Sequence, residues 1–83
     1  MTDIDYSKLR SVTARRVISA LVKDGFYLDR ESGSHYQYYH SDKRRVTVSF
    51  HHPSDTFPPK TLKGIIHDAN WSQADLKRLN LLK

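Results

Sequence analysis

The sequence has 83 residues, of which 37 % are hydrophobic, and it contains no cysteine. This length predicts a single domain with a small core, and the lack of cysteine excludes disulfide scaffolds, thiol nucleophiles and cysteine-based metal sites. Fourteen Lys and Arg face nine Asp and Glu, and the formal net charge of +5 makes nucleic acid the first partner to consider. We expect no signal peptide, no membrane span and a cytoplasmic location.

The first part of the chain is predicted to contain an arm followed by a helix. Residues 1–11 have too few apolar side chains to define an element, so we expect a loosely ordered arm, with residues 12–83 forming the single domain. Apolar residues at steps of three and four predict an amphipathic helix over 12–24. Gly25 can close this helix because glycine readily adopts the left-handed backbone conformation.

The apolar period then changes to two, which predicts three antiparallel strands joined by short turns. The second strand covers residues 35–40 and the third covers 45–50. Successive side chains of a strand point to opposite faces, so His35 lies on the open face if Tyr38 is in the core. The other residues expected on the core face are Phe26, Leu28, Val46 and Val48.

Two helices are predicted after the sheet. Pro59 suits the first turn of a helix over 59–69, and Ser72 with Asp75 resembles a capping box that begins a short last helix. The order of elements predicts an α+β domain of two layers, in which helices cover one face of a three-stranded antiparallel sheet.

Histidines are predicted to gather at one end of the sheet. Neighbouring antiparallel strands run in opposite directions, so His51, after the third strand, should lie close to His35 at the start of the second. We do not expect a zinc site that also includes His52, because adjacent residues of an extended chain point to opposite sides. No carboxylates are placed together for magnesium, so we expect neither a metal nor another cofactor.

Cationic residues supply possible phosphate contacts. Lys60 begins the second predicted helix, where free backbone N–H groups already favour a phosphate. Other candidates lie in the turn between the second and third strands, where they can equally be a solvated hairpin tip, and on the second helix. These residues are Lys43, Arg44, Arg45 and Lys63.

Four short motifs follow one another along the chain: Gly25-Phe26, then Gly33-Ser34-His35, then Val46-Thr47-Val48 running to a histidine, then Pro59-x-Thr61-Leu62-x-x-Ile65-Ile66. In this order and at these spacings they resemble HicA-type toxins over residues 12–71. The chain departs from the family at Ser49-Phe50, where a proline and a basic residue are common. The resemblance implies a fold like a double-stranded-RNA-binding domain, α-β-β-β-α.

The resemblance also implies an activity and a partner. Such toxins are mRNA interferases, small ribonucleases inhibited by a HicB-type antitoxin, and their essential histidine corresponds to His35. In our hypothesis His35 takes the proton of the substrate 2′-OH, Lys60 or the helix N-terminus holds the phosphorane charge, and His51 is the acid or a second orienting group. Ser34 joins the basic residues in binding RNA. We expect the antitoxin to cover His35 and to make any DNA contact itself.

Two other functions remain open from the sequence. A non-catalytic module for double-stranded RNA needs basic loops and no catalytic histidine, and would bind RNA without cutting it. An interaction subunit would use its open sheet face only to dock a partner, and would not depend on His35.

Overall fold

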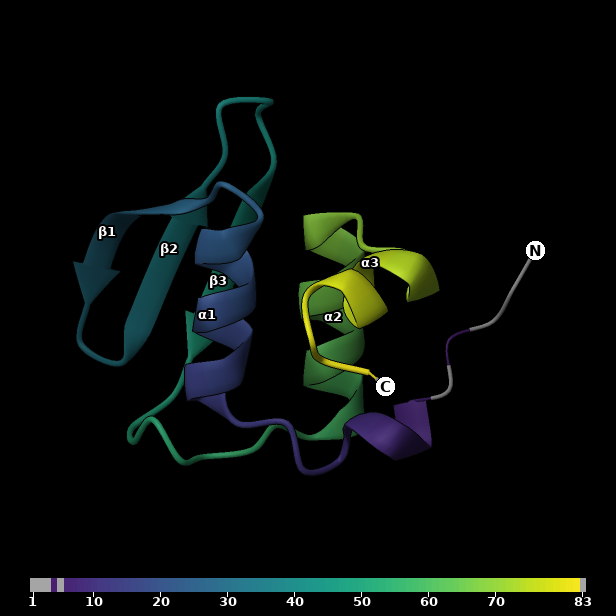
Figure 1. Cartoon of the computed structure of the whole chain (residues 1–83). Coiled ribbons are helices and arrows are strands. Elements are labelled where there is room, and N and C mark those ends of the chain that lie inside the picture. The colour runs from purple at the N-terminus through teal and green to yellow at the C-terminus, as the bar shows by residue number, and fades with distance from the viewer. Residues whose placement is uncertain (1–3, 5, 83) are drawn as a thin grey trace.

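The computed structural model describes residue 4 and residues 6–82, which form a sheet with helices packed against it (Figure 1). In chain order the elements are η1 (Tyr6–Leu9), α1 (Ala14–Lys23), β1 (Tyr27–Ser32), β2 (His35–Tyr39), β3 (Arg45–Ser49), α2 (Pro59–Ala69) and α3 (Gln73–Arg78). The strands are antiparallel and lie in the order β1-β2-β3. The predicted α+β class and the α-β-β-β-α order with a short last helix are confirmed.

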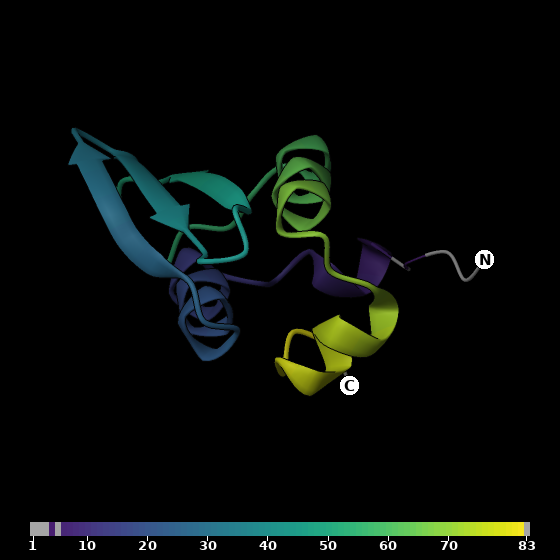
Figure 2. The same cartoon turned by 90° about the horizontal axis from the view of Figure 1, so that it is seen from above.

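The helices lie on one side of the sheet and leave the other side open, as predicted (Figure 2). Tyr38 of β2 and Val46 and Val48 of β3 are buried on the covered side. Phe26, just before β1, is buried with them. Because strand residues alternate between faces, this burial places His35 on the open face.

The prediction that Leu28 belongs to the core is wrong. Leu28 is 46 % exposed, and all six residues of β1 are exposed. β1 is an edge strand that pairs only with β2, and Figure 2 shows it extending beyond the helices that cover the rest of the sheet. A period of two indicates which residues share a face, but it cannot show whether anything covers that face.

Local signals set the ends of the helices. Thr13 caps α1 by accepting a hydrogen bond from the backbone N–H of Arg16 at 3.3 Å. Gly25 follows with a φ of +101°, and a Cβ there would stand 2.8 Å from Nε2 of His40, so glycine is required. The prediction of α2 over 59–69 and of the capping box between Ser72 and Asp75 is also confirmed.

The segment predicted as a loose arm contains ordered structure. η1 forms one turn over Tyr6–Leu9, and Leu9 is among the most deeply buried side chains. The expectation of no element is wrong for these residues, because a few apolar contacts to the core order the turn without helical periodicity. Residues 1–3 and 5 of the predicted arm lie outside the described residues. Across the part of the chain that the structure describes, no helix combines the length and apolar character needed to span a membrane.

Candidate functional site

His35 is the first residue of β2, and its exposed side chain lies on the open face of the sheet. It follows Gly33, whose φ of +59° allows the tight turn between β1 and β2. The backbone of His35 pairs with that of Ser49 at the end of β3. The side chains meet too: Nδ1 of His35 and Oγ of Ser49 are 2.7 Å apart. This hydrogen bond orients the imidazole and leaves Nε2 for other contacts.

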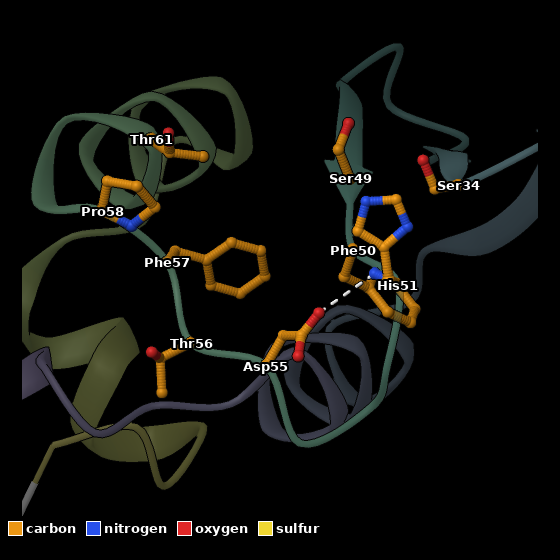
Figure 3. A pocket seen from close by; sticks show the side chains of 9 residues that line it. All are labelled: Ser34, Ser49, Phe50, His51, Asp55, Thr56, Phe57, Pro58 and Thr61. Carbon is orange, nitrogen blue, oxygen red and sulfur yellow. Dashed lines mark hydrogen bonds between the residues drawn. The ribbon is translucent and has the colours of Figure 1, made fainter.

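A cavity of about 440 Å³ lies beside this pair, between the end of β3 and the first turn of α2 (Figure 3). Ser34 and Ser49, the neighbours of His35, form one wall, and the ring of His51 points toward them. Thr61 of α2 lies across the cavity. The complete lining is Ser34, Ser49, Phe50, His51, Asp55, Thr56, Phe57, Pro58 and Thr61.

Asp55 fastens the loop that carries His51. Its Oδ2 accepts hydrogen bonds from the backbone N–H groups of His51 at 3.1 Å and of His52 at 3.0 Å. The N–H groups of His52 and His51 lower the pKa of the Asp55 carboxyl below its usual value. The loop is also tied to α1, because the carbonyl of Asp55 accepts from Ala14 N at 2.8 Å. The position of His51 is therefore fixed by the backbone around it.

The N-terminus of α2 opens toward the same cavity. Pro58 is the N-cap and makes no side-chain capping bond, so the first-turn amides have no cap from that residue. Helix N-termini attract anions through such amides. Lys60 is exposed in this first turn. Lys63 lies about one turn further along α2, with Nζ 5.0 Å from the centroid of the Tyr6 ring.

The three predicted cations of the β2–β3 turn lie at the other end of the strands from His35. Arg45 pairs with Tyr39, whereas His35 pairs with Ser49. Lys43 and Arg45 are exposed. The Arg44 guanidinium makes hydrogen bonds within the protein, because it donates to Asp24 at 2.9 Å and to the carbonyl of Ala69 at 2.6 Å. These contacts give Arg44 a structural role, and its RNA contact stays a prediction.

Two residues of the site were missed from the sequence. Ser49 gives no local signal, since only the register of β2 and β3 brings it to His35. Asp55 was hidden as well, because its carboxylate accepts from amides three and four residues earlier and not from the residues that follow it, as in a common Asx turn. Within the described ranges, no three His, Asp or Glu side chains come together as potential metal ligands.

Comparison with known proteins agrees with this arrangement. A search of curated proteins finds no match for the chain. A family model described as the HicA toxin of bacterial toxin–antitoxin systems matches residues 14–71, from the start of α1 to just past α2. The match covers more than two thirds of the sequence and includes the whole sheet and the cavity lining. The chain therefore belongs to the HicA family of toxins.

Proposed function

We propose that this toxin is an endoribonuclease that cleaves mRNA without a metal ion, with His35 as its catalytic residue. The observation that carries the proposal is the 2.7 Å contact between His35 Nδ1 and Ser49 Oγ at the edge of a cavity that also holds His51. An exposed imidazole that is held by one nitrogen and free at the other is suited to proton transfer.

The reaction uses the 2′-OH of the RNA as the nucleophile. Nδ1–H of His35 donates to Ser49 Oγ, which leaves the lone pair of Nε2 to take the 2′-OH proton. The 2′-oxygen attacks the phosphorus, and the bond from phosphorus to the 5′-oxygen breaks. Protonated His51 gives its proton to that 5′-oxygen, so the products are a 2′,3′-cyclic phosphate and a 5′-OH. Positioned acid–base groups of this kind contribute about 10²–10⁴-fold to a rate.

The N-terminus of α2 stabilises the negative charge of the phosphorane. Lys60 and the free amides belong to the first turn of α2, whose Pro58 and Thr61 line the cavity on the side opposite Ser34. One well-placed donor to such a charge contributes about 10²–10³-fold. Lys63, and at greater distance Lys43 and Arg45, bind the RNA backbone, with Ser34 as a hydroxyl contact beside His35.

The partner in this proposal is a HicB-like antitoxin with an acidic surface. The formal net charge of +5 on the toxin favours association with an acidic protein. Covering the cavity would block His35 and the α2 cations together, and any operator DNA would be bound by the antitoxin. The setting is the cytoplasm, where translated mRNA is found.

The test is cleavage of an unstructured RNA by the purified chain in excess EDTA. We expect wild type to cut and His35→Ala to lose about 10²–10⁴-fold in rate. The matched control is His52→Ala, because His52 is exposed, next to His51, and outside the cavity lining. His52→Ala should cut at the wild-type rate.

Three outcomes contradict the proposal. Cleavage by His35→Ala at the wild-type rate removes the histidine from catalysis. Cleavage that EDTA abolishes assigns the chemistry to a metal. Salt-sensitive RNA binding with no cleavage by any variant indicates a non-catalytic RNA-binding module instead.

A further inference from the structure

The open face of the sheet carries a row of side chains that the cleavage step does not use. Tyr27 pairs with Tyr39, and Tyr39 pairs with Arg45, so the three residues cross all three strands in line. The rings of Tyr27 and Tyr39 meet edge to face with centroids 5.9 Å apart. The Arg45 guanidinium lies 5.4 Å from the Tyr39 ring centroid. We call these residues the tyrosine–arginine row.

The outer members of the row remain accessible. Tyr27 is 51 % exposed, Arg45 is exposed, and Tyr39 between them is half-buried. Tyr39 therefore lies between its neighbours, and the Tyr27 and Arg45 side chains are the members of the row that a ligand can reach.

A bulge in β1 adds a further cation to this face. The register skips Asp29, so that Arg30 pairs with Gln37 although Leu28 pairs with Tyr38. Paired residues share a face. Strict alternation from Leu28 would place Arg30 on the covered side of the sheet. The extra residue reverses this placement and turns Arg30 toward the open face.

The charge of the open face selects its ligand. The described positions that pair on this face include two arginines, and the unpaired Asp29 of the bulge adds one carboxylate beside Arg30. The paired positions are Tyr27, Arg30, Ser32, His35, Gln37, Tyr39, Arg45, Thr47 and Ser49. Aromatic rings and guanidinium planes are the groups on which proteins stack unpaired bases, and the arginines also neutralise phosphates.

From these observations we infer that the tyrosine–arginine row is a stacking site for an unpaired base of the RNA substrate, separate from the cleavage site. The inference rests on the proposed function, because His35 begins the same strand that Tyr39 ends. Three residues of the strand lie between them, and four steps along the strand give a distance of about 13 Å. The stacked base belongs to a nucleotide that flanks the scissile bond, so the row contributes to substrate selection by requiring single-stranded RNA on that side.

The experiment measures RNA binding, without cleavage, by the full chain carrying His35→Ala. Fluorescence anisotropy follows a set of short RNAs in which one base at a time is removed and the backbone is kept intact. We expect removal of one base, outside the two nucleotides joined by the scissile bond, to weaken RNA binding roughly 5- to 100-fold, as is typical for the loss of a stacked base. Adding Tyr27→Ala should cause a similar loss with intact RNA and no further loss with that abasic RNA.

Matched variants separate stacking from folding. Tyr27→Phe keeps the ring and should retain full affinity. Leu28→Ala removes a neighbouring exposed side chain that pairs on the other face, and should change nothing. Arg45→Gln should weaken binding of intact RNA less strongly than Tyr27→Ala, since a planar amide remains. Thermal unfolding of each variant shows whether the sheet is intact.

The inference is overturned if Tyr27→Ala and the abasic RNA lose affinity additively, or if neither loses any. It is also overturned if Tyr27→Ala abolishes neutralisation by the antitoxin while RNA affinity stays unchanged, because the row is then a protein contact. Failure of the proposed function appears elsewhere, as absence of cleavage by wild type. The anisotropy measurement follows RNA binding by a His35→Ala variant, so its result does not depend on whether wild type cleaves RNA.

Discussion

Ser49 is the side chain that hydrogen-bonds to Nδ1 of His35. In the proposed mechanism Nδ1–H of His35 donates to Ser49 Oγ, and this hydrogen bond keeps its direction when Nε2 takes up a proton. Ser49→Ala should slow RNA cleavage roughly 2- to 10-fold, the effect of one ordinary hydrogen bond. ¹⁵N NMR of the imidazole should show a smaller fraction of the Nδ1–H tautomer.

Two variants check that this effect comes from the hydroxyl. Ser49→Thr keeps an oxygen and suits a strand, so it should restore both the rate and the tautomer. Thr47→Ala removes the preceding exposed hydroxyl of β3 on the same face and should leave both unchanged. An unaltered tautomer in Ser49→Ala would assign Ser49 a role in packing only.

The face of the sheet on which a residue lies was predictable from sequence where alternation along one strand decides it. The open-face location of His35 followed from the aromatic pattern of β2 and the burial of Tyr38. Arg44 was not predictable in this way. Its partner Asp24 is 20 residues earlier, and the two meet only when the hairpin packs against the end of α1.

At the scale of elements, the loop between β3 and α2 determines where His51 stands. Asp55 holds the backbone of His51 and His52, and its own carbonyl is bound to α1. Asp55→Ala should therefore increase amide hydrogen exchange at both histidines and lower the cleavage rate toward that of His51→Ala. The helices and the sheet should remain folded, since the side chain of Asp55 bonds only within this loop.

The exposed Ser54 of the same loop provides the control for this prediction. Ser54→Ala should retain both slow exchange at the histidines and full activity. If Asp55→Ala speeds exchange but leaves cleavage unchanged, His51 does not act as the acid. If exchange is unchanged as well, the backbone bonds to α1 are enough to hold the loop.

Elements were predictable when their ends carry a chemical signal. Pro59 sets the start of α2, and Ser72 with Asp75 sets the start of α3, because both motifs satisfy or remove the free amides of a first turn. η1 carries no such signal and is ordered by the burial of Leu9. The bulge at Asp29 was also hidden, since an extra residue in one strand is defined only by its partner strand.

At the scale of the whole molecule, Asp24 joins elements that are distant in sequence. Its carboxylate, 10 % exposed, accepts hydrogen bonds from Arg44 at 2.9 Å, Trp71 at 2.9 Å and Arg78 at 3.0 Å. These donors come from the β2–β3 turn, the end of α2 and α3, while Asp24 itself caps α1. One carboxylate thus ties the hairpin and both C-terminal helices to the first helix.

Removal of this carboxylate should destabilise the whole fold. Asp24→Ala removes the carboxylate that accepts from the Trp71 N–H and from half-buried Arg44, which keeps the Ala69 carbonyl and Asp42, at a cost of about 2–4 kcal/mol. A chain of this size has a total stability of roughly 4–12 kcal/mol. Asp42→Ala is the matched control, because it removes the more exposed carboxylate partner of Arg44 and should cost much less. Urea unfolding of the two variants beside wild type measures both losses.

The contribution of Asp24 to the free energy of unfolding should decrease as the pH is lowered into the acid range. Burial acts to raise the pKa of this carboxyl, but the hydrogen bonds from Trp71, Arg78 and Arg44 outweigh burial and hold the pKa below its ordinary value of 3.8. A group whose pKa is lower in the folded state stabilises the fold above the unfolded-state value and loses that effect as the pH falls through the folded value. The stability gap between wild type and Asp24→Ala should therefore be constant near neutral pH and narrow below 3.8. A gap that stays constant throughout acid unfolding would mean that Asp24 acts by its shape and neutral hydrogen bonds, and that its charge does not hold the elements together.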